Sequence, residues 1–239
     1  MQMIATGGKA VYGASVGILM LDARFPRIHG DIGNATTFPF PVLYRIVRGA
    51  SPDLVVRQGA AGLLDLFIAA ARELEADGAD GLTTTCGFLS LFQQDLADAV
   101  SIPVVTSSLM QVDMVNRMLP AGQRAGVLTI SESSLTETHL TAARVPLDTP
   151  IGSTENGREF TRAVLDNRNT FDIEAARDDN VRAACDLVAA SPEVGAIVLE
   201  CTNMSPFAAE IQEATGVPVF SIITLIHWLQ AGLLPKRYV

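Results

Sequence analysis

The sequence predicts an α/β fold made of two similar halves, each containing a parallel sheet. The first observation behind this prediction is an internal repeat around two cysteines. The stretch from Cys86, CGFLSLFQQDLADAVSIPVVT, aligns without a gap with the stretch from Cys201, CTNMSPFAAEIQEATGVPVFS. The second is an alternation of apolar, β-rich runs with helical patterns, which is typical of βαβ units. Two similar halves would present two equivalent faces to a molecule bound between them.

The predicted elements follow this alternation along the chain. Several of the strand candidates are continuous apolar runs, as expected for strands that are covered on both faces. The strands are expected at 16–21, 42–47, 81–85, 104–106, 124–130, 196–199 and 217–221. The helices are expected at 59–76, 90–100, 109–118, 172–190, 206–215 and 222–234. Ser90, with Gln93 three residues later, fits a capping box, and Ser205 followed by Pro206 fits a second helix start.

The chain is expected to divide near Ser108, giving a first half over 1–108 and a second half over 109–216. The last strand and helix, within 217–239, could return to the first half. The segment 23–41 is rich in Pro, Gly and Asn and has no periodic pattern. A connection of this length is often functional, so it could be a lid over the cleft, or else a surface loop.

The composition limits the kind of ligand. The chain has 239 residues, of which 49% are hydrophobic and 18% charged, so it can bury a sizeable core. Its formal charge of −9 argues against nucleic acid, and no apolar run reaches the roughly 20 residues of a membrane span. Three cysteines without a C-x-x-C pair indicate reduced thiols in the cytoplasm and no metal site. We therefore expect a small-molecule partner.

Cys86 and Cys201 each follow an apolar strand and precede a helix, so both are expected at the carboxyl end of a strand, facing a helix N-terminus. Such a position favours a bound carboxylate and lowers the pKa of a thiol. A thiolate on one face of a carbon acid could remove the α-proton while a thiol on the other face returns one, without any cofactor. The backbone N–H groups after the two cysteines and the hydroxyls of Thr85 and Thr202 could stabilise the charge that develops on a substrate carboxylate or amide.

A lone cysteine among apolar residues is more often a small buried hydrophobe than a catalyst, and Cys185 fits that description. For Cys86 and Cys201, the matched positions in the repeat favour function. The preferred function is racemisation or epimerisation at the α-carbon of an amino acid or a derivative. Two different functions stay open: a related isomerase or decarboxylase that uses one thiol, and a non-catalytic sensor whose thiols respond to oxidation.

The strings TTTC, ending at Cys86, and ECTNM, around Cys201, resemble the two cysteine motifs of the aspartate/glutamate/hydantoin racemase superfamily. The resemblance covers nearly the whole chain. It implies two α/β domains related by a pseudo-two-fold axis, with the active site in the cleft between them. It also implies cofactor-independent racemisation with two catalytic cysteines. Enzymes of this kind could assemble as homo-oligomers.

Several positions depart from the motifs of that superfamily. Gly87 and Phe88 stand where Asn-Thr is common in glutamate racemases, and Asn203 stands where a histidine is common. Glu200 occupies a place where a glycine is common. The aromatic ring of Phe88 indicates a more apolar pocket, suited to hydantoins or other substituted acids. Asn203 could be a substrate ligand or a turn residue.

Two further candidates for substrate binding come from the same resemblance. Asp22 ends the first strand at a place that resembles the auxiliary acid of the family, and Ser131 is its counterpart in the second half. Asp22 could equally be a turn or helix-cap residue.

Overall fold

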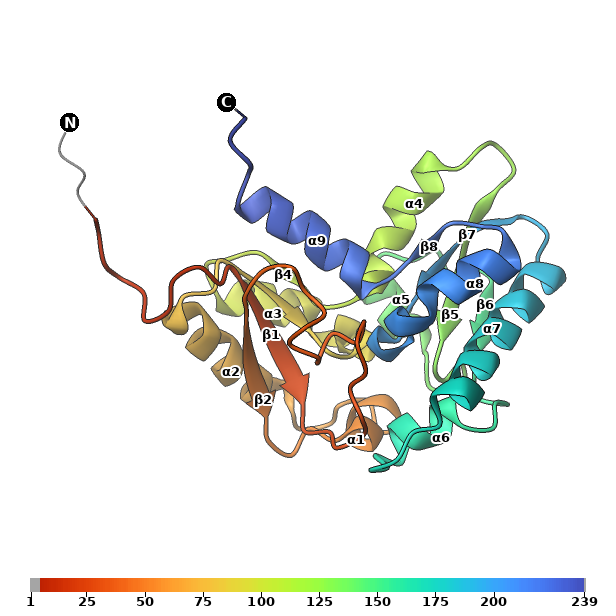
Figure 1. Cartoon of the computed structure of the whole chain (residues 1–239), viewed down its shortest axis with the longest axis horizontal. Coiled ribbons are helices and arrows are strands. Elements are labelled where there is room, and N and C mark those ends of the chain that lie inside the picture. The colour runs from red at the N-terminus through yellow and green to blue at the C-terminus, as the bar shows by residue number, and fades with distance from the viewer. Residues whose placement is uncertain (1–4, 239) are drawn as a thin grey trace.

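The computed structural model describes residues 5–238. Its strands form two separate parallel sheets that lie on opposite sides of the molecule, as Figure 1 shows. The first sheet has the order β2-β1-β3-β4 and the second the order β6-β5-β7-β8. The first contains β1 (Val16–Leu21), β2 (Val42–Val47), β3 (Gly81–Thr84) and β4 (Val104–Val105). The second contains β5 (Arg124–Thr129), β6 (Ile151–Ser153), β7 (Val194–Leu199) and β8 (Val219–Phe220).

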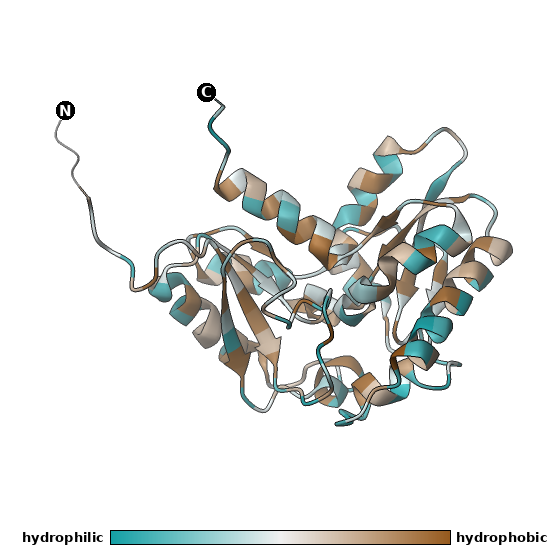
Figure 2. Cartoon of the chain, viewed as in Figure 1, coloured by the Kyte–Doolittle hydropathy of each residue, from teal (hydrophilic) through white to brown (hydrophobic). Residues whose placement is uncertain are grey.

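The two sheets correspond strand by strand, which confirms the predicted α/β fold of two similar halves. In each half, the strand that precedes the cysteine pairs in parallel with the first strand of that half, β3 with β1 and β7 with β5. Both cysteines therefore follow equivalent strands. In Figure 2 the strands of both sheets are mostly hydrophobic, as expected when helices cover their faces.

Helices pack on the sheets and at the ends of the strands. Those of the first half are α1 (Pro52–Val56), α2 (Leu64–Asp77), η1 (Gly87–Phe92) and α3 (Gln93–Ala99). The connection to the second half contains η2 (Ser108–Gln111) and α4 (Val112–Met118). The second half has α5 (Glu137–Ala142), α6 (Phe160–Leu165), α7 (Ile173–Ala190), η3 (Thr202–Phe207) and α8 (Ala208–Thr215). The last helix is α9 (Ile222–Leu233).

The end of the chain connects the two sheets. β8 pairs with β7 in the second sheet, whereas the apolar face of α9 packs on the first sheet. Ile222 and Ile226 of this helix join one buried cluster with Val16 and Ile18 of β1. The division of the chain into domains near Ser108 stays a prediction. Within 5–238, no helix has both the length and the apolar character needed to cross a membrane.

Three local predictions are wrong. Ser90 lies inside η1 and donates a hydrogen bond to the carbonyl of His139 at 3.1 Å, so it is not an N-cap. Ser205 likewise lies inside η3. In both halves a short 3₁₀ segment separates the cysteine from the α-helix, and the helical period of the sequence does not distinguish the two kinds of turn. The helix expected from residue 59 begins at Leu64, because Gly59, Ala60 and Gly62 adopt positive φ angles and form a turn.

Candidate active site

Cys86 and Cys201 line the same cavity, although each follows a strand of a different sheet. The cavity lies between the two halves and is small, with a volume of about 20 Å³, which is room for about one water molecule. Most of its wall is apolar and comes from both halves: Phe25, Val56, Phe88, Ile130, Val164 and Leu165. Its polar lining comes from Thr85, Glu200 and Asn203.

Each cysteine is held by the change from strand to 3₁₀ segment. Both residues have extended backbone angles and stand directly before η1 and η3. The backbone N–H groups of Phe88 and Leu89 lower the pKa of the Cys86 thiol, and the backbone N–H of Asn203 lowers that of Cys201. Each cysteine therefore stands at the amino end of the following segment, as the sequence predicts.

The thiol pKa values nevertheless differ from the prediction. The side chains of Cys86 and Cys201 are almost fully buried, with 8% and 6% exposed. This burial raises the pKa of both thiols well above the ordinary value, and the negative charge of Glu200 raises it further. The backbone N–H groups act in the opposite direction but are outweighed. The expectation of a lowered thiol pKa is therefore wrong.

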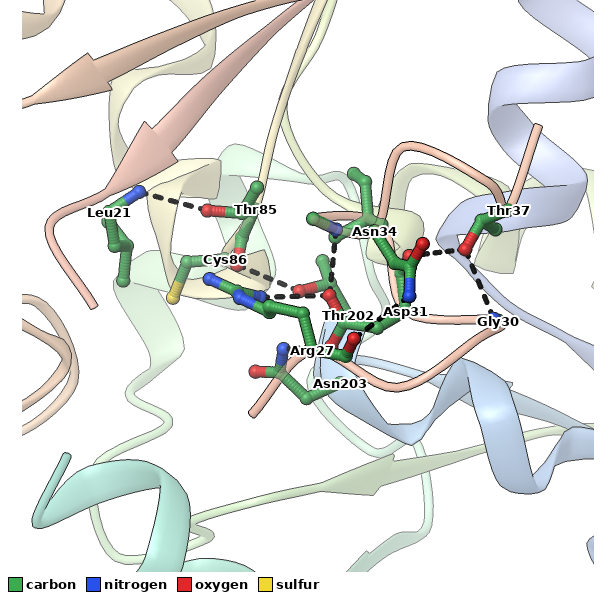
Figure 3. Close-up of polar contacts among 12 residues, drawn as sticks. Leu21, Arg27, Gly30, Asp31, Asn34, Thr37, Thr85, Cys86, Thr202 and Asn203 are labelled. Carbon is green, nitrogen blue, oxygen red and sulfur yellow. Dashed lines mark hydrogen bonds and ion pairs between the residues drawn. The ribbon is translucent and has the colours of Figure 1, made fainter. Parts of the chain in front are cut away.

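The surroundings of the two thiols are not equivalent. The positive charge of Arg27 lowers the pKa of Cys86, partly offsetting the effect of burial. The thiol of Cys201 instead donates to Asn203 Oδ1 at 3.6 Å. Asn203 Nδ2 donates to Asp31 Oδ2 at 2.7 Å, and Asp31 Oδ1 accepts from Arg27 Nη1 at 3.0 Å. Figure 3 shows this group of side chains next to Cys86.

The segment 23–41 forms part of the cavity wall. Phe25 lines the cavity, and Asp31 joins the segment to Asn203 in the second half. Gly30 has a φ of +93°, and a Cβ at this position would lie 3.0 Å from the Cα of Pro206. The close approach and the positive φ both favour glycine here. The segment thus packs against Asn203 and Pro206 of the second half, as a cover of the cavity would.

Glu200 is a fully buried carboxylate in this cavity. Its Oε2 accepts a hydrogen bond from Thr129 Oγ1 at 2.8 Å, whereas its Oε1 has no hydrogen-bond partner among residues 5–238. Burial raises the pKa of Glu200 to about 7. From the sequence, Glu200 was only a departure from a family motif. The available signal was a carboxylate placed between an apolar strand and a cysteine.

Thr85, Phe88 and Asn203, all expected to bind substrate, line the cavity. The hydroxyl of Thr85 accepts from the backbone N–H of Leu21 at 3.0 Å, which leaves its own hydrogen for a ligand. The hydroxyl of Thr202 is already used, because it donates to the carbonyl of Thr85 at 2.7 Å and joins the two halves. Gly87 packs against Glu200 rather than forming part of the cavity lining.

Asp22 and Ser131, the remaining two candidates, are not among the residues that line the cavity. Asp22 accepts from Arg48 Nη1 at 3.2 Å and from the backbone N–H of Gly49 at 3.3 Å, as a turn residue would. Ser131 donates to Glu155 Oε1 at 2.6 Å. The structure therefore does not bring these two side chains to the thiols.

Asp31 is a contact of the site that sequence reasoning missed, whereas Arg27 could be recognised from the sequence only as a loop arginine able to steer an anionic substrate. Both lie in the segment 23–41, where no periodicity fixes the direction of a side chain. The spacing of four residues between an arginine and an aspartate was the only local signal for their ion pair. That signal does not predict that the pair reaches a residue from the other half.

The raised pKa of Glu200 predicts how stability depends on pH. Because the pKa rises from 4.5 to about 7 on folding, the folded state holds this proton more tightly than the unfolded state. The favourable contribution is complete below pH 4.5 and is lost as the pH rises through 7. As the pH rises through 7, the free energy of unfolding of Glu200→Gln should therefore increase by up to about 3 kcal/mol relative to that of the native protein. Urea unfolding of both proteins at about pH 5 and about pH 8 measures the change, and a pH-independent difference would contradict it.

Burial also predicts the order of thiol reactivity. In the ligand-free protein, the half-buried Cys185 should be alkylated faster than Cys86 and Cys201, because the latter two are buried and protonated. Mass spectrometry after brief treatment with iodoacetamide gives the three rates, and the unfolded protein is the control in which they should become similar. Faster labelling of Cys86 or Cys201 in the folded protein would contradict the prediction.

Comparison with known proteins identifies a matching family and several relatives. The family described as Asp/Glu/Hydantoin racemase matches residues 55–229. A dimethylsulfoniopropionate lyase from Durusdinium sp. clade D is 29% identical, with 92% of this chain and 75% of the relative covered. Dimethylsulfoniopropionate lyase 6 from Emiliania huxleyi (strain CCMP1516) is also 29% identical, over 92% of this chain but only 60% of the relative.

Solved structures share the fold at lower sequence identity. A glycine-to-cysteine mutant of arylmalonate decarboxylase has a TM-score of 0.62 at 18% identity, with 92% of each chain covered. The aspartate racemase of Picrophilus torridus has a TM-score of 0.58 at 12% identity, covering 95% of this chain and 96% of the other. The family match spans most of the chain and includes both cysteines. The chain therefore belongs to the Asp/Glu/hydantoin racemase family, as its two cysteine motifs indicate.

Proposed function

We propose that this chain is a cofactor-independent enzyme that uses a cavity thiolate to remove a proton from the carbon next to a substrate carboxylate. The observation that carries this proposal is the placement of Cys86 and Cys201 on one buried cavity shared by both halves. A cavity closed to water strengthens the electrostatic interactions that stabilise a developing carbanion. Thr85 supports the same role, because the hydrogen of its hydroxyl can be donated to an enolate oxygen.

We infer that elimination is the preferred outcome, so that the enzyme is a lyase acting on a β-sulfonio carboxylate such as dimethylsulfoniopropionate. The thiolate takes the α-proton and becomes a thiol. The electron pair of the broken C–H bond forms the C=C bond of acrylate, and the electron pair of the C–S bond leaves with neutral dimethyl sulfide. The relatives named as dimethylsulfoniopropionate lyases support this reaction, because their similarity extends over 92% of the chain. The apolar wall suits two methyl groups on sulfur.

Cys86 is the better candidate for the base. Its thiolate would be stabilised by the charge of Arg27 and by the N–H groups of Phe88 and Leu89. Cys201 is arranged to keep its proton, since its thiol donates to Asn203 Oδ1. An elimination needs one base on the α-carbon, which this unequal pair can supply. Cys201 would then act as a proton donor or as part of the wall.

Racemisation is the second candidate, and one specific observation favours it. Both thiols line the cavity at equivalent strand ends, so Cys201 could return a proton to the face opposite Cys86. Decarboxylation and redox sensing have less support. The malonate substrate of a decarboxylase has a second carboxylate, whose negative charge would lie near ionised Glu200. An oxidation sensor requires accessible thiols, whereas Cys86 and Cys201 are buried.

Single cysteine variants distinguish elimination from racemisation. With dimethylsulfoniopropionate as substrate, Cys86→Ser should lower the rate of dimethyl sulfide release by about 10²- to 10⁴-fold, because it replaces the base by a far weaker one. Cys201→Ser should lower it by about tenfold or less. Gas chromatography of dimethyl sulfide and NMR of acrylate provide the two readouts.

Cys185→Ser is the matched control, because this cysteine lies in α7, away from the cavity, and its replacement should leave the rate unchanged. A panel of chiral amino acids and hydantoins in D₂O tests the second candidate. Three results together would replace elimination by racemisation as the proposed reaction. Deuterium is incorporated with inversion, either Cys86→Ser or Cys201→Ser abolishes this exchange, and no dimethyl sulfide is released. Near-normal elimination by Cys86→Ser would contradict its role as the base.

A further inference from the structure

Glu200 is a polar group of the cavity that the protein leaves incompletely satisfied. Its side chain is fully buried, and Oε1 has no hydrogen-bond partner within 5–238. Gly87 packs directly against this oxygen, since a Cβ on Gly87 would lie 2.3 Å from it. Its charge acts on both Cys86 and Cys201. The carboxylate is therefore near the two sulfurs, and its Oε1 is buried against Gly87 without a hydrogen-bond donor among the described residues.

No cationic side chain of residues 5–238 forms an ion pair with Glu200. Arg27, whose charge acts on the thiol of Cys86, is already paired with Asp31 at 3.0 Å. An ionised carboxylate buried without a cation is strongly unfavourable, so such groups are usually neutral or paired. A cation brought by a ligand would supply the missing charge.

We propose that Glu200 is the specificity residue of the cavity and binds a methylated, positively charged sulfonium or ammonium group of the substrate. This inference rests on the proposed function for the location of the substrate, and adds the group that recognises its cationic end. Phe88 lines the same cavity and offers its aromatic ring to the methyl groups of such a cation, whereas the Arg27 guanidinium already lies over the ring of Phe25 at 4.3 Å. The cavity thus combines one carboxylate with an apolar, aromatic wall.

The hydrogen-bonding groups of the cavity favour a methylated cation over a primary ammonium. A primary ammonium has three N–H donors, and each loses water on entering the cavity. Asn203 Oδ1 already accepts from Cys201, and Thr85 Oγ1 already accepts from Leu21 N–H, so Glu200 Oε1 is the cavity side-chain oxygen left without a donor within 5–238. A methylated onium group has no donors to satisfy. Its charge can be balanced by Glu200 while its methyl groups contact the apolar wall.

The same contact has a consequence for the thiols. The charge of Glu200 makes the thiolate of Cys86 less favourable, and a cation bound to Glu200 would offset that charge. Thiolate formation would therefore be favoured only when the cationic end of the substrate occupies the cavity. Neutral hydantoins and dicarboxylates would lack this effect.

A pair of isosteric ligands isolates the contribution of the charge. The probes are 3-(trimethylammonio)propanoate and 4,4-dimethylpentanoate. Both have a carboxylate and the same shape, but the first has a positively charged quaternary nitrogen where the second has a neutral carbon. Calorimetry at about pH 8 should show the native protein binding the cation at least about tenfold more tightly than the neutral probe. β-Alanine, with a primary ammonium, should bind more weakly than the trimethylated cation.

Glu200→Gln should reduce the preference for the cation to within about twofold while retaining binding of 4,4-dimethylpentanoate, which also shows that the cavity is intact. Glu193→Gln is the control, because it removes the same charge at the other end of β7 and should retain the preference. Should Glu200→Gln not fold, Glu200→Asp is the second variant. It keeps the charge but shortens the side chain, and should lower the preference by severalfold.

Three results would overturn the inference: equal or tighter binding of the neutral probe by the native protein, binding of neither probe, or a preference that survives in Glu200→Gln. The proposed function is tested separately. Cys86→Ser should retain the preference for the cation, because Glu200 is intact in that variant. A preference without lyase activity would support the inference and contradict the elimination, whereas lyase activity without a preference would contradict the inference alone.

Discussion

The structure depends on the way in which the ends of the two cysteine strands meet. The hydroxyl of Thr202 donates to the carbonyl of Thr85, and the hydroxyl of Ser108 donates to the carbonyls of Leu199 and Glu200. These buried bonds join the two sheets at the residues that precede or follow the cysteines. They hold the carboxyl ends of β3 and β7 close together, so both thiols reach one cavity. Because buried polar groups are costly when unpaired, the bonds also fix how the two halves pack.

The same packing creates a conflict between burial and chemistry. A thiolate base has to carry a negative charge in a cavity where Cys86 and Cys201 are almost fully buried. The negative charge of Glu200 makes this thiolate less favourable. Two negative charges this close are unfavourable in a medium of low dielectric constant. A substrate that brings a positive charge resolves the conflict, because it balances one of the two. This requirement connects the elimination proposed for Cys86 with the binding role proposed for Glu200.

The internal repeat made much of the fold predictable. It led to two similar parallel-sheet halves and to cysteines at equivalent strand ends, because strand and helix periods are local properties of the sequence. The three-residue strand β6 was too short to give a signal, and the 3₁₀ segments after the cysteines were mistaken for the first turns of helices. The contacts of Asp31 with Asn203 and of Gly87 with Glu200 cross between the halves. Such contacts depend on tertiary packing, which sequence periodicity does not encode.

The two halves differ outside the repeat, and this difference bears on the reaction. The segment 23–41 brings Arg27 and Asp31 from the first half, and these residues act on the two thiols in different ways. Arg27 favours the ionised form of Cys86, whereas Asp31 orients Asn203, which accepts a hydrogen bond from the thiol of Cys201. A racemase that works in both directions needs its two thiols to exchange the roles of acid and base. A pair fixed in one assignment is better suited to a reaction in which a single base starts the chemistry and the departure of a leaving group completes it.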